Sequence, residues 1–357
     1  MEENKQNIII IKRKEKLNNS IIIKEKNILG IEILRIILCF TVVLDHLYKN
    51  TNFYKFRYII YYHIPSFFII SFYFNYKTFI SFNIKKIKGR LERLFIPYFY
   101  WSIISWIINV IYFEFFNIDN VHSFKSLLIH LINGHQFNYS LWFQNIISLI
   151  TILSLIIIFI FRKNFISILL ILNLVAYISQ YTGFNYNFFK NNFTINSSAT
   201  FGRFAEAIPN AVTGFILAYI DILKKSNKYK YIYFYMSIIV LLFITKYHEF
   251  DNIKTFKYGG IRLNIAAISL FIIFSLLPFE KIKNRICIKI IKQITSYTGG
   301  IYFMHRLFGY GHLCRKYIPP IKKGNFLGCI IIYLICYIIS FIMSIFLKNT
   351  KLRHLFS

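Results

Sequence analysis

Long apolar runs, separated by short basic segments, recur along the whole chain and limit the folds that it can adopt. A helix of about 20 apolar residues crosses the hydrocarbon core of a membrane, and hydrophobic residues make up 56% of this sequence. Soluble domains are less apolar than this, so the sequence predicts an all-α, polytopic membrane helical bundle. The ten expected transmembrane spans are 28–48, 58–78, 94–116, 141–161, 165–181, 201–220, 231–247, 260–279, 294–312 and 326–347.

The positive charge is arranged as in a membrane protein. A formal net charge of +29 would suggest a nucleic-acid partner in a soluble protein, but here Lys and Arg lie mainly between the apolar runs. When Lys77 and Lys246 at the span ends are counted with the adjoining segments, 27 of these residues fall on the side of the amino terminus and 12 on the other side. The positive-inside rule places the richer side in the cytoplasm. We therefore expect a multi-pass protein of the cell membrane, with both termini cytoplasmic and no nucleic-acid partner.

The expected organisation is a single membrane domain with two short ends. Residues 1–27 form a basic cytoplasmic segment, 28–347 the transmembrane domain, and 348–357 a short cytoplasmic tail. The basic loop 313–323 is an exception to the charge pattern, because it falls on the outer side. Either this loop binds an anionic ligand or the ninth span does not cross fully. The five cysteines lack the spacing of metal ligands, so no metal site is expected.

The first span carries ionisable groups, which are expensive inside a membrane and usually mark a site or a pathway. Arg35 and His46 are eleven residues apart, or about three helical turns, so they fall on nearly the same face about 16 Å from each other. This face presents a fixed cation at one depth and a titratable imidazole at another. The alternative is that both side chains only reach to the two membrane interfaces and end the span.

Further polar groups accompany the next spans. His63 comes just before Pro65, which suits a helix start, and it lies at a depth similar to that of His46; the alternative is an ordinary interfacial histidine. Arg90 and Arg93 are one helical turn apart and could form a basic fork for phosphate groups. The alternative for this pair is a loop that holds anionic lipid.

Two later spans also hold charged side chains. Arg203 and Glu206 are one turn apart, so they can pair with each other. His305 lies next to Arg306 within the ninth span. The sequence contains no Ser-centred nucleophile elbow, His-Glu-x-x-His zinc motif or phosphate-binding glycine loop.

Taken together, these segments resemble the acyltransferase-3 family of integral membrane acyltransferases. No single motif is specific, but the set occurs in the family's order from the first span to the ninth. The matching segments are Arg35 with ten residues before His46, His63-Ile64-Pro65-Ser66-Phe67-Phe68, Arg90-x-x-Arg93 followed by Pro97-Tyr98, Ser140-Leu141-Trp142-Phe143, Arg203 to Gly214 with Pro209 between them, and Ile301-Tyr302-Phe303-Met304-His305.

The resemblance implies an acyl-CoA-dependent O-acyltransferase that moves an acyl group, often acetyl, onto a hydroxyl of a glycan or a small molecule. It implies that His46 is the general base, that Arg35 is a second catalytic residue on the donor side, and that Arg90 and Arg93 bind the CoA phosphates. No bound cofactor is expected, because acyl-CoA is a co-substrate. The residues expected around the acceptor are His63, Trp142, Arg203, Glu206 and His305.

The chain departs from the family's pattern at two positions. Phe72 stands where glycine is usual, and it would narrow a helix crossing that glycine normally allows. Asp45 stands where an aromatic residue is common, and on a helix it points away from His46. Both departures bear on substrate specificity and activity more than on the fold.

The sequence leaves two other classes of protein open. A proton-coupled transporter would use the same kinds of intramembrane groups, but it would be expected to contain inverted repeats, and the sequence has no such symmetry. The third class is a catalytically silent membrane-interaction protein, which Phe72 leaves possible.

Overall fold

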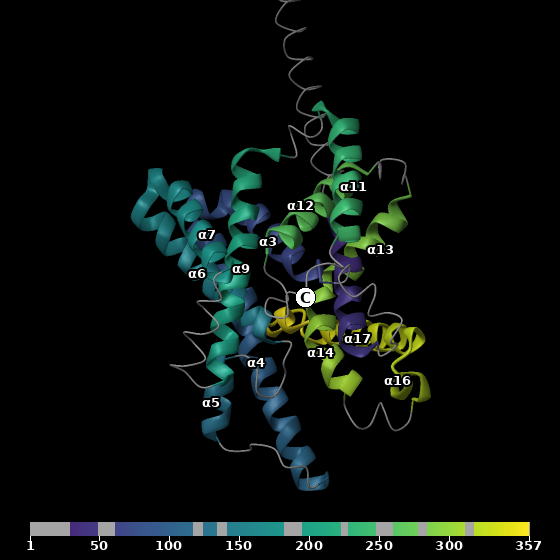
Figure 1. Cartoon of the computed structure of the whole chain (residues 1–357). Coiled ribbons are helices and arrows are strands. Elements are labelled where there is room, and N and C mark those ends of the chain that lie inside the picture. The colour runs from purple at the N-terminus through teal and green to yellow at the C-terminus, as the bar shows by residue number, and fades with distance from the viewer. Residues whose placement is uncertain are drawn as a thin grey trace, which may run out of the picture.

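The computed structural model describes residues 29–48, 61–116, 124–133, 141–181, 195–222, 228–247, 260–277, 284–310 and 318–356. The regular structure in these ranges is helical throughout (Figure 1), which confirms the predicted all-α class. The basic segment at the amino terminus and residues 313–317 of the predicted basic loop lie outside the described residues.

A helix occupies each range that the apolar runs predicted. The first described helix covers residues 29–47. The later α-helices are α3 (His63–Ile80), α4 (Ile84–Phe116), α5 (Phe124–Asn133), α6 (Leu141–Phe161), α7 (Phe165–Tyr181), α9 (Ile195–Tyr219), α11 (Lys230–Tyr247), α12 (Ile261–Leu276), α13 (Arg285–Ser296), α14 (Thr298–Tyr310), α16 (Pro319–Lys323) and α17 (Phe326–Phe346). Two 3-10 helices, η2 (Arg162–Asn164) and η5 (Lys351–Leu355), complete the described set.

Several parts of the chain differ from the predicted ranges. Among them, α13 begins at Arg285, before the predicted ninth span, and α16 lies in the predicted basic loop. The basic loop before the third span is not a loop, because α4 includes both Arg90 and Arg93. The ninth range is divided at Tyr297, which separates α13 from α14. Residues 124–133 form a helix, α5, that the sequence did not predict.

Among the described residues, two stretches are apolar and long enough to cross a membrane by length and composition alone. They are Leu141–Ile178, which joins α6 to α7, and Phe326–Phe346. The apolar helix α12 is shorter, and the helix 29–47 carries four ionisable side chains within its length: Glu32, Arg35, Asp45 and His46. The ten-span topology and the cytoplasmic position of both termini stay predictions.

The close crossing of α3 and α9 explains how the bundle accommodates Phe72. A Cβ atom on Gly214 of α9 would lie 2.6 Å from the backbone oxygen of Ile69 and 3.1 Å from Cβ of Phe72. The glycine that lets these helices approach is therefore on α9. The Phe72 ring fills the space beside the crossing, 5.2 Å from the ring of Phe215 and fully buried.

Polar side chains also join the helices. Asn264 of α12 donates to the side-chain oxygen of Asn210 of α9 at 2.8 Å, and Thr213 donates to Asn264 at 3.1 Å. Such bonds hold helices together in lipid, where burying apolar surface gains little.

The last residues of the chain, predicted to be a short tail, pack into the bundle. The Trp101 indole nitrogen of α4 donates to the backbone oxygen of Leu355 at 3.0 Å. The Trp101 ring also meets the Phe356 ring edge to face at 5.7 Å. Leu355 and Phe356 are both buried, so η5 is fixed against α4.

Candidate active site

The imidazole rings of His46 and His305 are stacked, with their centroids 5.2 Å apart and their planes inclined by 24°. His46 lies one residue before the end of the helix 29–47, and His305 lies in the middle of α14. His305 is completely buried, whereas His46 is partly exposed. Two residues predicted separately for catalysis and for the acceptor pocket therefore share one site.

The hydrogen bonding of His305 assigns its tautomer. Its Nδ1 lies 2.6 Å from the backbone oxygen of Tyr302, and a carbonyl oxygen can only accept, so Nδ1 carries a proton. Among the described residues, the buried Nε2 has no hydrogen-bond partner. In the neutral ring this nitrogen is an acceptor, which leaves a lone pair inside the site.

His63 is the third histidine of the site. It opens α3 and is buried, and it lies close enough to His305 to act on it electrostatically. Pro65 fits the first turn of this helix because a backbone N–H there would have no intrahelical partner. The helix start predicted from Pro65 is thus confirmed, and it places His63 in the interior.

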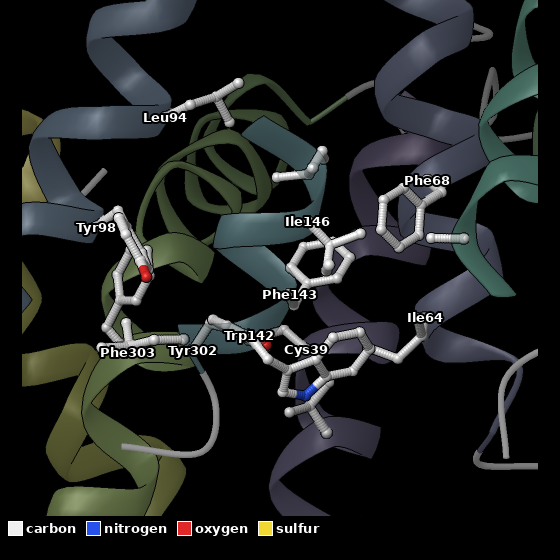
Figure 2. Close-up of a cluster of buried hydrophobic side chains, with 14 of the residues drawn as sticks. Cys39, Ile64, Phe68, Leu94, Tyr98, Trp142, Phe143, Ile146, Tyr302 and Phe303 are labelled. Carbon is white, nitrogen blue, oxygen red and sulfur yellow. The ribbon is translucent and has the colours of Figure 1, made fainter. Parts of the chain in front are cut away.

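A row of aromatic side chains connects the histidines to Arg203. The guanidinium carbon of Arg203 lies 4.4 Å from the ring centroid of Trp142, a cation–π contact. Phe143 follows Trp142 on α6 and lies 5.5 Å from the Tyr302 ring, which in turn lies 5.9 Å from His305. Figure 2 shows Trp142, Phe143 and Tyr302 gathered in the buried cluster.

Glu206 lies one turn beyond Arg203 on α9 and is buried. Asn210 donates to its backbone oxygen at 3.1 Å. Both Glu206 and Arg203 make further contacts within the structure. Glu206 therefore lies on the helix that supplies Arg203 to the site.

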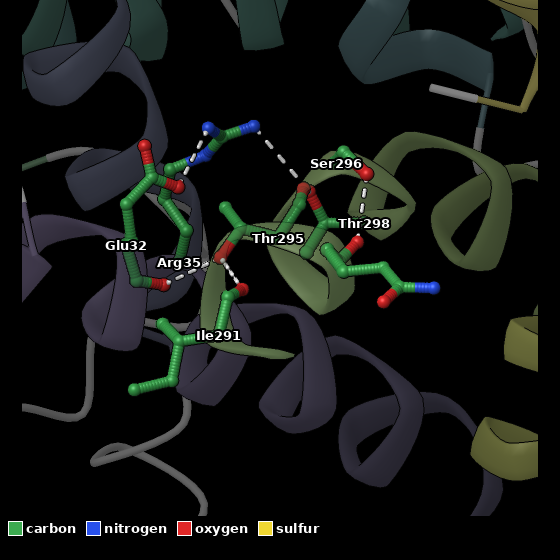
Figure 3. Close-up of polar contacts among 7 residues, drawn as sticks. Glu32, Arg35, Ile291, Thr295, Ser296 and Thr298 are labelled. Atoms are coloured by element: carbon green, nitrogen blue, oxygen red, sulfur yellow. Dashed lines mark hydrogen bonds and ion pairs between the residues drawn. The ribbon is translucent and has the colours of Figure 1, made fainter. Parts of the chain in front are cut away.

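Arg35 lies eleven residues before His46 on the same helix and makes different contacts. Its Nη1 lies 3.4 Å from a carboxylate oxygen of Glu32, and its Nη2 donates to Thr298 Oγ1 at 3.4 Å. Figure 3 shows the side chain reaching from one helix to the first residue of α14. Arg35 thus joins the two helices that carry the stacked histidines, and its role as a catalytic residue stays a prediction.

Arg90 and Arg93 of α4 have different environments. Arg90 is buried: it donates to Ser71 Oγ at 2.6 Å and its guanidinium lies 5.9 Å from the rings of both Phe72 and Phe79. Burial, and then the nearby charge of Arg93, lowers the pKa of Arg90 to about 9, so it stays charged at neutral pH. Arg93 is exposed. The predicted fork therefore presents one arginine outward and anchors the other.

The end of the chain adds positive charge beside Arg93. Burial first, and then the charges of Arg353 and Arg93, lower the pKa of His354, so both arginines act electrostatically on one imidazole. Glu92 acts on His354 in the opposite direction. Sequence reasoning missed Arg353 because it lies in a segment predicted to be a tail.

Tyr302 is the other residue that sequence reasoning gave no role. It accepts from His305 through its backbone oxygen and packs on Phe143 through its ring. Its position three residues before His305, within the same motif, is the signal that would have found it.

Comparison with known proteins identifies the class. A family model described as an acyltransferase domain matches residues 28–353, nearly the whole chain, so the protein is an acyltransferase by family. The chain belongs to the acyltransferase-3 family, whose members are membrane proteins. No curated protein and no solved structure matches the chain.

Proposed function

We propose that the protein is a multi-pass acyltransferase of the cell membrane that moves an acyl group from cytoplasmic acyl-CoA to a hydroxyl group of a glycan or a small molecule. The proposed acyl group is acetyl, and the proposed general base is His46. The observation that carries this proposal is the stacking of His46 on His305 at 5.2 Å.

The three histidines differ in how far a substrate can reach them. A general base must come within hydrogen-bonding distance of the proton that it removes. His63 and His305 are 1% and 0% exposed, whereas His46 is partly exposed. These exposures favour His46 as the base. His305, whose Nδ1 is held by Tyr302, then orients the His46 ring by stacking.

The proposed reaction has two steps. The acceptor hydroxyl oxygen attacks the thioester carbonyl carbon while His46 takes the hydroxyl proton. Collapse of the tetrahedral intermediate breaks the carbon–sulfur bond, and the departing sulfur takes the proton from the imidazolium ring. The products are an ester and free CoA. Imidazole suits both transfers because it titrates near neutral pH, and such catalysis typically contributes about 10²–10⁴-fold.

The positive charges of α4 and η5 support a donor site. Arg93 is exposed and can bind a phosphate through two parallel hydrogen bonds. Arg353 is also exposed and lies near the same histidine, His354. We assign the binding of the CoA phosphates to Arg93 and Arg353. Arg90 contributes its positive charge from its buried position and anchors α4 through its hydrogen bond to Ser71.

The acceptor side is assigned to Trp142 and Arg203. Arg203 has five N–H donors, which suit the hydroxyl oxygens of a glycan, and its stacking on Trp142 fixes their direction. His63 and Glu206 are buried, and we assign them a supporting role behind this surface.

A paired assay on purified, reconstituted protein tests the proposal against a transporter. Acetyl-CoA labelled in the acetyl group is supplied with mixed glycan acceptors, and both CoA thiol release and labelled ester are measured. Equal formation of the two products is expected. Acceptor movement into sealed vesicles without acetyl-CoA, and without ester formation, would contradict it.

A further inference from the structure

Helix α13 has one basic face and one apolar face. At 100° per residue, Arg285, Lys289 and Lys292 lie together on one side, and Ile286, Ile290 and Ile294 lie on the other. The helix has a defined start, because the side chain of Asn284 accepts from the backbone N–H of Ile286 at 2.9 Å. The two faces are therefore fixed by the helix itself.

The apolar face of α13 is largely uncovered by the described residues. Ile286 is 68% exposed and Ile290 is 48% exposed. Thr295, in the last turn, is the only buried residue of α13. Exposed isoleucines that line one face of a helix indicate a surface that contacts an apolar phase.

The length and the charge of α13 show which apolar phase fits. The helix has 12 residues and is about 18 Å long, which is shorter than the roughly 30 Å hydrocarbon core. Basic side chains along one face and isoleucines along the other are typical of helices that lie in the plane of a membrane interface. Lys and Arg there are attracted to anionic lipid headgroups.

The last turn of α13 is bonded to the helices that carry the histidines. Thr295 Oγ1 donates to the backbone oxygen of Glu32 at 3.3 Å. Thr298, the first residue of α14, accepts from Arg35 at 3.4 Å (Figure 3). These hydrogen bonds couple the depth of α13 in the membrane to the positions of the helix 29–47 and of α14.

We propose that α13 lies in the membrane interface, with Ile286 and Ile290 among the lipid chains and its three basic side chains against the phosphates of anionic lipids. It acts as a lipid-dependent anchor for the two helices that carry His46 and His305. This anchor does not depend on the reaction that the protein catalyses.

A fluorescent label on Cys287 tests the position of α13 in the full-length protein. Cys287 is exposed on the apolar side, Cys39, Cys329 and Cys336 are buried, and Cys314 is changed to Ser. The labelled protein is reconstituted into phosphatidylcholine vesicles with and without phosphatidylglycerol. Quenching by lipids with a spin label near the headgroup is compared with quenching by iodide in water. The matched control carries the label at Ser296→Cys, on the basic face, in a Cys287→Ser background.

We expect lipid quenching of the Cys287 label and protection from iodide, with the reverse order at position 296. Anionic lipid should increase the lipid quenching, and Lys289→Gln with Lys292→Gln should abolish that increase. Equal iodide quenching at both positions would overturn the proposal. Exclusion of both quenchers would also overturn it, because protein, including a second copy of the chain, would then cover the face. An increase that survives both substitutions would overturn the role of the basic face.

Discussion

His46 and His305 are stacked at 5.2 Å, although most of the chain separates them. The contact joins the end of the first described helix to the middle of α14. One ring is accessible and the other is buried with its Nδ1 bonded to Tyr302. The site therefore has a partly exposed imidazole stacked on a buried one.

His305→Phe tests the role of that neighbour. Phenylalanine keeps a flat ring beside His46 but removes the bond to Tyr302, and loss of one neutral hydrogen bond typically costs about 1 kcal/mol. We expect about a fivefold fall in kcat for acyl transfer with little change in the KM for acyl-CoA. The kcat of His305→Ala, which also removes the ring, should fall further. Equal rates for the two variants would show that stacking contributes nothing.

Arg203→Lys tests the assignment of the acceptor side. Lysine keeps the charge but loses the planar stack on Trp142 and the fixed set of donors. The KM for the acceptor should rise several-fold, while the KM for acyl-CoA should not change. Initial rates measured by varying each substrate in turn separate these effects. A rise in the KM for acyl-CoA alone would contradict this assignment and would place Arg203 in the donor site instead.

The donor site predicts different outcomes for three arginines. Arg93→Gln and Arg353→Gln should each raise the KM for acyl-CoA about tenfold, since hydrogen bonds to charged groups contribute about 1.5–3 kcal/mol, and neither should lower the melting temperature. Arg90→Gln should lower the melting temperature, because it removes the buried bond to Ser71.

Lys163→Gln, in the exposed turn η2, is the control for these arginine variants. It should match the wild type in both measurements. An unchanged KM for Arg353→Gln would exclude η5 from the donor site.

Gly214→Ala tests the helix crossing at Phe72. The added Cβ would lie 2.6 Å from the backbone oxygen of Ile69, and forcing atoms into a packed interior typically costs about 1–3 kcal/mol. The melting temperature in detergent should fall. The matched control is Gly202→Ala on the same helix, where nothing lies within 4 Å of the added atom; alanine should be neutral or slightly stabilising there. Similar melting temperatures for the two variants would contradict the close crossing.

The sequence predicts the helices better than their contacts. Apolar runs predict where helices form, because a backbone in lipid must satisfy its own hydrogen bonds. The same pattern does not say which helices touch, so the sequence does not predict the pairing of His46 with His305. The charge of Arg90 favours a surface loop, but α4 continues through this residue and buries it against Ser71. The charge of Lys289 likewise suggests an exposed loop, but this residue lies in the helix α13. The basic and apolar faces of α13 can be recognised in the sequence.

The most direct test of the central claim is the rate of acyl transfer by His46→Gln in the full-length, reconstituted protein. CoA release and ester formation are measured together, with His248→Gln, outside the described residues, as a histidine control. The account predicts a fall of about 10²–10⁴-fold with unchanged acyl-CoA binding and melting temperature, and a wild-type rate for the control. A wild-type rate for His46→Gln would contradict it.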